Sequence, residues 1–292
     1  MTSHEPRDRQ PQPRVSTRVN SGKAVLRRTG YVAFMAAVLA FFAVPMLWLA
    51  SAPFDSDPGL GLHWPDWTLS NWTATFEHPY ALGSLVNSVV LCVVATAVTT
   101  VLATLAAYAL SRVRIPGRDA LLYLLLLLSS VVTGTAAMVP IFVMMFQLGL
   151  INSQYATGLV LAGGILPAAI FILKDFIDSV PRSYEESARV FGASPAQVLL
   201  HVVLPVARPG IATILVWAFV QAWGNFLLPF LLLRDIDAQP AAVLLNTMKD
   251  EGGSANLTVI PVFSLLYAVP VVVLYLFVSK RYGFRFHGGI KA

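Results

Sequence analysis

Six long apolar runs constrain the fold of this chain more than any other feature of its sequence. A bilayer core about 30 Å thick is crossed by a helix of about 20 apolar residues, and a helix satisfies its own backbone groups within lipid. The runs therefore predict an all-α membrane protein with six transmembrane helices. They cover residues 31–52, 84–110, 120–146, 155–174, 210–233 and 259–279. The third run is long enough to tilt or to break near Pro140.

The composition agrees with a membrane protein and argues against several other classes. Of the 292 residues, 57% are hydrophobic and only 12% are charged, which lies outside the usual range of soluble domains. The single cysteine, Cys92, allows no internal disulfide and no cysteine-based zinc site. The histidines are scattered over the expected tail and loops, at positions 4, 63, 78, 201 and 287, so we expect them to be solvated and predict no metal site.

Lysine and arginine predict the orientation of the chain in the membrane. With a cytoplasmic N-terminus, the inside segments hold 18 of the 20 lysines and arginines, and only Arg234 and Lys249 lie outside. This asymmetry follows the positive-inside rule, so both termini are expected in the cytoplasm. It also accounts for the net charge of +5 without a nucleic-acid partner. A cleavable signal peptide is disfavoured, because a long polar region precedes the first run and Pro53 follows the cleavage-like residues 50–52.

The two long outer segments, 53–83 and 234–258, hold eight of the acidic residues. Three tryptophans, Trp64, Trp67 and Trp72, lie close together in the first of them. Tryptophan is enriched where the bilayer meets water. We therefore expect these side chains at the membrane interface, with contact to a partner as the alternative.

Two absences bear on the energy source. No Asp, Glu, Lys, Arg or His lies in the centre of any apolar run, whereas ion-coupled transporters commonly need such groups at depth. The chain also lacks the G-x-x-x-x-G-K-[ST] phosphate loop, so it cannot hydrolyse ATP by that route. No Ser/His/Asp set or pair of carboxylates lies within a span. These observations predict a protein that is not an enzyme and that is driven by another subunit.

Neutral polar residues in and near the apolar runs are candidates for a solute path. They are Asn87, Ser88, Thr133, Thr135, Gln147, Gln221 and Asn225. Helix-breaking residues lie beside some of them: Gly163, Gly164 and Pro167 in the fourth run, and Gly224 and Pro229 in the fifth. Broken or kinked helices expose backbone groups toward a cavity. The set favours a path for a neutral, hydroxyl-rich solute, and interhelical hydrogen bonding is the alternative.

The polar stretch YEESARVFGASPAQ, residues 184–197, interrupts the apolar sequence between the fourth and fifth runs. Ser183 and Glu186 have the spacing of a capping box, and so do Ser194 and Gln197. Gly192 lies between them, where a helix commonly ends in a left-handed residue. The pattern predicts two short cytoplasmic helices joined at glycine, the second ending before Pro205. They could pack under the bundle, or the exposed Tyr184, Val190 and Phe191 could insert into the cleft of a partner.

The residues from Glu186 to Pro205 resemble the EAA motif of bacterial ABC importer permeases, which reads E-A-A, three residues, G, nine residues and I/V-x-L-P. Glu186, Ala188 and Gly192 match its core, and Val202, Leu204 and Pro205 match its end. Further fragments resemble the MalG-like carbohydrate permeases of that family: NSVVL, AYALSRVRIPGR, MVPIFVMMFQLGLINSQY, FILKDFIDSVP and the terminal GGIKA. Together they span about residue 84 to the end.

The resemblance implies the type I ABC importer permease fold, with a cytoplasmic coupling helix pair between spans four and five. Residues 1–29 would form a basic cytoplasmic tail, 30–83 the first span and outer loop, 84–280 the transmembrane core with the EAA loop 181–208, and 281–292 a cytoplasmic tail. The implied partners are a second, MalF-like permease, ABC ATPase subunits and an extracytoplasmic solute-binding protein. ATP and Mg²⁺ would be bound by the ATPase subunits, with no cofactor in this chain. The implied location is the bacterial cell membrane.

The resemblance also assigns site residues. Coupling to the ATPase is expected from Tyr184, Glu185, Glu186, Ser187, Ala188, Phe191, Gly192, Leu204 and Pro205. Candidates for the substrate path are Asn87, Gln221, Trp223 and Asn225. The implied substrate is a sugar, with a polyol or a glycerol phosphate as the alternative. An ion-coupled secondary transporter and a structural membrane protein are the rival functions.

The chain departs from the family pattern at three places. Phe191 stands where the family usually has aspartate, and Ser187 stands where it has its second alanine. Compared with the family pattern, position 191 therefore lacks an acidic contact and could make an apolar one. In the fifth run, Trp223-Gly224-Asn225-Phe226 lacks the acid that the family often carries there. That absence agrees with a neutral substrate.

Overall fold

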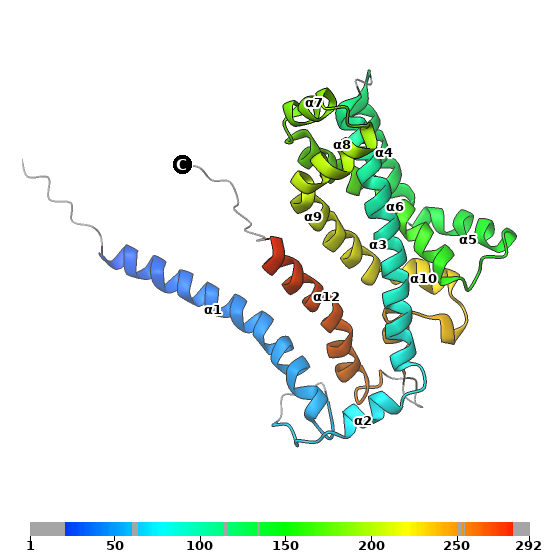
Figure 1. Ribbon diagram of the computed structural model, residues 1–292. Helices are drawn as coiled ribbons and strands as arrows, with labels where there is room; N and C mark the ends of the chain where they lie inside the picture. Colours follow the sequence, from blue (N-terminus) through cyan, green and yellow to red (C-terminus); the bar gives the residue numbers. More distant parts are fainter. Residues whose placement is uncertain are drawn as a thin grey trace, which may run out of the picture. The chain divides into compact units, whose positions relative to one another are not determined.

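The computed structural model describes residues 21–59, 64–113, 116–132, 135–249, 253 and 255–282, and these divide into two compact units at Ser51. The terminal GGIKA and the first part of the basic tail lie outside the described residues. The first unit is helix α1, Ser21–Ser51 (Figure 1). It begins within the segment expected to be a polar tail. Its apolar side chains are mostly exposed, as expected of a helix that faces lipid or another subunit.

The second unit is built on four long apolar helices, namely α3, Ala81–Arg112, α6, Gln154–Asp178, α9, Leu204–Trp223, and α12, Ile260–Tyr282. With α1, the described residues contain five helices long and apolar enough to cross a membrane. Each corresponds to one of the expected runs. The described part of the chain contains no β-strand beyond two isolated bridges. The all-helical prediction is therefore confirmed.

Glycines let the long helices approach closely. A Cβ atom on Gly158 of α6 would lie 2.9 Å from Cγ1 of Val94 in α3, and one on Gly210 of α9 would overlap the ring of Phe176 in α6. Small residues at such crossings are typical of helices that pack within membranes. α3 packs more extensively against α6 than against any other described helix. The three helices α3, α6 and α9 thus form the frame to which the other elements attach.

The third apolar run is divided between two shorter helices. α4, Arg118–Val132, is followed by the 3-10 turn η2, Thr135–Ala137, and by α5, Met138–Gln147. A helix of 15 residues is about 22 Å long, which is shorter than a bilayer core. The interruption lies just before Pro140, which enters α5 in its first turn, where the missing N–H needs no helical acceptor.

The two interruptions expected from glycine and proline have different outcomes. α9 ends at Trp223 with Gly224 as its C-cap, and α10, Leu227–Leu232, follows, so the break in the fifth run is confirmed. At Gly163, Gly164 and Pro167 the fourth run is not broken, because α6 continues through all three, with Pro167 inside the helix. Membrane helices tolerate an internal proline where neighbouring helices satisfy or shield the carbonyl that it leaves free.

Short elements gather at the two ends of the second unit (Figure 1). At one end lie η1, Ala52–Phe54, α2, Ser70–Glu77, η4, Ile236–Ala238, and α11, Ala241–Thr247. At the other end lie α7, Arg182–Val190, α8, Pro195–Val198, and the π-helical turn η3, Leu199–Val203. α2 and α7 are therefore separated by the length of α3 (Figure 1).

Candidate functional site

The polar segment between α6 and α9 folds as two short helices, as the sequence predicts. α7 ends at Val190, and Gly192 adopts a φ of +85° while its N–H bonds to the carbonyl of Arg189 at 2.9 Å. The left-handed glycine is therefore confirmed. The capping box expected at Ser183 is wrong, because α7 begins at Arg182 and its N-cap is Pro181, without a side-chain bond. Ser183 lies inside the first turn and cannot act as the cap.

The second helix begins as expected and ends differently. Ser194 and Gln197 form a complete capping box, with the amide N–H of Ser194 bonded to Oε1 of Gln197 at 2.8 Å. The expected stop before Pro205 is wrong, because α8 continues through the π-turn into α9. The N–H of Leu204 bonds back five residues to Leu199. This wider turn brings Pro205 into the first turn of α9, where a proline is tolerated.

The expected site residues divide between two faces. We call the outward set the exposed face, and it consists of Tyr184, Glu186, Ser187, Val190 and Phe191. Phe191 is 90% exposed and Val190 84%, among the highest values for large apolar side chains in the described part of the chain. Two such neighbours at a helix end are typical of a surface that a partner covers. Of the other expected residues, Gly192 is exposed, Ala188, Leu204 and Pro205 are half-buried, and Glu185 is buried.

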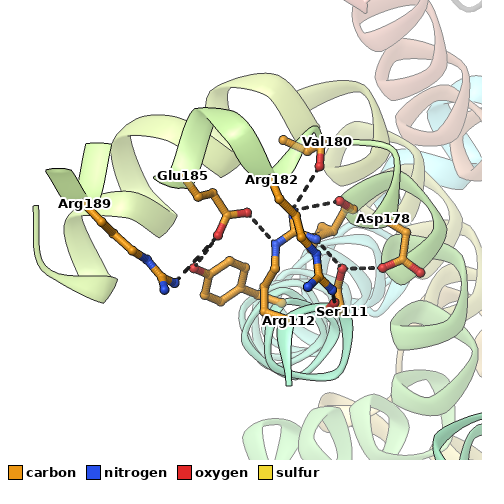
Figure 2. A network of polar contacts seen from close by, with 9 residues as sticks. Ser111, Arg112, Asp178, Val180, Arg182, Glu185 and Arg189 are labelled. Atoms are coloured by element: carbon orange, nitrogen blue, oxygen red, sulfur yellow. Dashed lines mark hydrogen bonds and ion pairs between the residues drawn. The ribbon is translucent and has the colours of Figure 1, made fainter. Parts of the chain in front are cut away.

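Glu185 lies under α7 and is held by the end of α3 (Figure 2). Its Oε1 atom accepts a hydrogen bond from Nε of Arg112 at 2.5 Å, and its Oε2 atom accepts one from the Tyr108 hydroxyl at 3.2 Å. Arg189, one turn along α7, lies 4.0 Å from Oε2 and is largely exposed. Glu185 is thus buried and Glu186 is exposed, although the two are adjacent in sequence.

The guanidinium of Arg112 also bonds to the end of α6. Its Nη2 donates to the carbonyls of Ile177 at 3.2 Å and Val180 at 3.3 Å, and its Nη1 donates to Oγ of Ser111 at 2.7 Å. Arginine commonly satisfies the last carbonyls of a helix in this way. Arg112 therefore contacts three elements at once: α3, the C-terminal end of α6, and α7.

A second ion pair lies beside the first. Nζ of Lys174 lies 2.7 Å from Oδ2 of Asp178, and Ser111 donates its hydroxyl to the same carboxylate. Nη2 of Arg182 donates to the backbone carbonyl of Ser111 at 3.1 Å (Figure 2). Glu185 therefore has two cationic neighbours, Arg112 and Arg189, and Asp178 is paired with Lys174.

Sequence reasoning missed this network, although its local signals are present. Three pairs have the four-residue spacing that places side chains on one helix face: Tyr108 and Arg112, Lys174 and Asp178, and Glu185 and Arg189. The spacing does not reveal that the three helices meet. Only the packing of α3 beside α6 brings these pairs together.

The four candidates for the substrate path lie at or near the other end of α3 and α9. Nδ2 of Asn87 donates to the carbonyl of Asp237 at 2.7 Å, and Oδ1 of Asn225 accepts from the N–H of Leu228 at 3.2 Å. Trp223 is buried and stacks on Tyr267 of α12 with ring centres 5.2 Å apart. Gln221 is exposed. The described residues contain no group of three or more His, Cys, Asp or Glu that could hold a metal ion.

Comparison with known families and proteins shows which proteins this chain is similar to. The family described as "Binding-protein-dependent transport system inner membrane component" matches residues 101–283. The galactooligosaccharides transport system permease protein GanQ of Bacillus subtilis (strain 168) is 30% identical over 261 residues, which cover 86% of this chain and 89% of that protein. The maltodextrin transport system permease protein MdxG of the same organism is 28% identical, over 74% of this chain and 77% of that protein.

Solved structures share the fold. A chain of a bacterial ABC transporter involved in the import of the acidic polysaccharide alginate has a TM-score of 0.72 and 22% identity, and the match covers 92% of this chain and 99% of that chain. A second structure, of a bacterial alginate ABC transporter in complex with an alginate pentasaccharide-bound periplasmic protein, has a TM-score of 0.64 and 17% identity, over 90% of this chain and 96% of that chain.

Proposed function

Because the chain belongs to the family of binding-protein-dependent transport system inner membrane components, we propose that it is a permease subunit of an ATP-driven importer. In this proposal it spans the membrane six times, with α4 and α5 together forming the third span. Support comes from the six apolar runs and from the fold that the chain shares with an ABC transporter chain over 92% of its length. A second, MalF-like permease subunit would complete the translocation path.

The proposed substrate is a sugar, delivered by a solute-binding protein. The relatives GanQ and MdxG are named for galactooligosaccharide and maltodextrin transport. No ionisable side chain lies in the centre of an apolar run, and a neutral solute needs no such group to balance a charge. A polyol or a glycerol phosphate remains the alternative substrate.

The exposed face of α7 is proposed as the docking point for an ATPase subunit. The observation that carries this assignment is the exposure of Val190 and Phe191 at the end of the second unit that the lysine and arginine distribution assigns to the cytoplasm. Burying two such side chains in a partner cleft would be favourable. The solute-binding protein would dock at the opposite end, around α2 and the segment 234–249.

The proposed mechanism is an exchange between two states of the helix bundle. Closure of the ATPase subunits around ATP would move α7 and α8, and these would move the spans between inward-facing and outward-facing arrangements. Loaded binding protein on one side and ATP on the other would each bias the same equilibrium. The chain itself carries out no chemistry in this scheme.

A single cysteine tests the docking assignment. Ser187 is exposed in the middle of α7, so the Ser187→Cys variant, in a background without Cys92, should crosslink to an ATPase subunit when labelled with benzophenone maleimide and irradiated, because the photoactivated benzophenone inserts into a nearby C–H bond of any subunit. The matched control is Leu82→Cys, which lies in the first turn of α3 at the far end and is also exposed. Capture of the ATPase from Leu82→Cys, or of membrane subunits alone from Ser187→Cys, would contradict the assignment. Mass spectrometry identifies the captured subunit.

A further inference from the structure

α7 is attached to the rest of the second unit through a buried carboxylate. Glu185 is the one buried residue of this helix and is 3% exposed. Both of its oxygens are bonded to side chains of α3, from Arg112 and Tyr108, which are four residues apart and share a face. The Arg112 side chain is only 11% exposed. The attachment is therefore directional and largely shielded from water.

Arg112 extends the attachment to a third helix. Its Nη2 atom bonds to the carbonyls of Ile177 and Val180, at the C-terminal end of α6. A planar guanidinium can reach a carboxylate and two carbonyls at once, whereas the ammonium of lysine acts as a point charge. α3, α6 and α7 thus share one cation at the point where α7 joins the bundle.

We propose that Glu185 and Arg112 are positioning residues that tie α7 to α3 and α6, so that movement of α7 is delivered to those two helices. The proposal rests on the proposed coupling function. α7 is bounded by Pro181 and by the left-handed Gly192, where the backbone could otherwise absorb the movement. Separating the buried pair would leave unpaired charges, which is unfavourable in a shielded site. Glu186 then contacts the partner, and Glu185 transmits the movement.

A purely local role for the pair makes a different prediction. If the pair only neutralises two buried charges, an apolar pair of similar size should replace it fully, because buried ion pairs can be exchanged for packed apolar residues without loss of stability. If the pair transmits movement, the apolar replacement restores folding and leaves α7 without its bonds to α3 and α6, so the movement is no longer delivered. The two roles are therefore separable in one double variant.

The experiment reports movement at the far end of α3. The complete transporter, purified through a tag on this chain and placed in nanodiscs, carries Leu82→Cys in a Cys92→Ala background. Leu82 is 49% exposed. The rate of maleimide labelling is measured without nucleotide and after trapping with ATP and vanadate, and variants are compared at equal amounts of trapped nucleotide. The readout is the nucleotide-dependent change in rate.

If movement passes through the Glu185–Arg112 pair, Glu185→Gln should lower this change at least about fivefold, the lower end of typical coupling between distant sites. The double variant Arg112→Met with Glu185→Leu should assemble and show the same loss, and it replaces Glu185→Gln if that variant does not assemble. Asp175→Asn removes an exposed carboxylate of α6 instead and should leave the change intact.

A full nucleotide-dependent change in an assembled Glu185→Gln or double variant would contradict transmission through the pair and leave the proposed coupling function standing. The background chain separates this outcome from failure of the proposed function. If nucleotide never alters labelling of the background chain and Ser187→Cys captures no ATPase, the proposed coupling function is wrong. Transmission through the Glu185–Arg112 pair is then wrong as well. If Glu185→Asp, which keeps the charge on a shorter side chain, recovers part of the change that Glu185→Gln loses, the directional bond is supported.

Discussion

Two adjacent glutamates have separate surroundings because of the geometry of a helix. Consecutive side chains of an α-helix point about 100° apart, so when Glu185 faces α3, Glu186 must face away. Burial of Glu185 is stable because Arg112 and Tyr108 bond to both of its oxygens. Removing one partner of such a buried pair typically costs about 3–5 kcal/mol.

The backbone conformation at position 192 requires a glycine. Its φ of +85° disfavours any side chain, and a Cβ atom there would meet nothing within 4 Å. Gly192→Val should therefore destabilise the α7–α8 turn through backbone strain alone, by about 1–2 kcal/mol. Thermal unfolding of the purified transporter should shift downward, and ATPase stimulation by the binding protein should fall.

Asparagine is the matched control for that position, because it tolerates the left-handed region better than other residues with a side chain. Gly192→Asn should keep most of the stability and stimulation that Gly192→Val loses. Equal behaviour of valine and glycine would show that the turn does not require positive φ.

At the scale of elements, close packing of α6 and α9 depends on Gly210. A Cβ atom there would overlap the ring of Phe176, so Gly210→Ala should force the two helices apart. Overpacking of this kind typically costs about 1–3 kcal/mol. The expected result is a lower midpoint of thermal unfolding for the purified transporter, measured in one detergent.

The matched control for Gly210→Ala is Gly163→Ala. Gly163 also lies inside a membrane helix, and a Cβ atom there would meet nothing within 4 Å. It should be neutral or stabilising by up to about 1 kcal/mol, since alanine favours helix over glycine. The same loss in both variants would show that helix propensity, and not the contact with Phe176, dominates.

Local sequence predicts most of the helices, but it predicts only some of the positions where they end. Apolar length predicts α1, α3, α6, α9 and α12, whereas the spacing of capping residues and Gly192 predict the short helices on either side of that glycine. Pro167 and Pro205 are less predictable, because whether a proline ends a helix depends on its surroundings. α6 runs through Pro167, and a π-turn brings Pro205 into α9. Spacing within α6 and α7 shows potential ion pairs, but only tertiary packing shows that Arg112 and Glu185 meet.

At the scale of the whole chain, basic residues are distributed unevenly between the segments expected on the two sides of the membrane. The segments expected outside carry eight acidic residues and two basic ones, whereas those expected inside carry 18 of the 20 lysines and arginines. Within the second unit, α2 and the exposed face of α7 lie at opposite ends of α3 (Figure 1). This polarity suits a subunit that receives a solute-binding protein on one side and a motor on the other.

The most direct test of the importer assignment is uptake by the complete transporter in proteoliposomes, supplied with its solute-binding protein. Labelled maltodextrin and galactooligosaccharide are offered in turn, with glycerol 3-phosphate as the alternative substrate. A sugar should accumulate only when ATP is present on the ATPase side, and ionophores should leave its uptake unchanged. Uptake by this chain without ATPase subunits, driven by an ion gradient and abolished by an ionophore, would contradict the importer assignment.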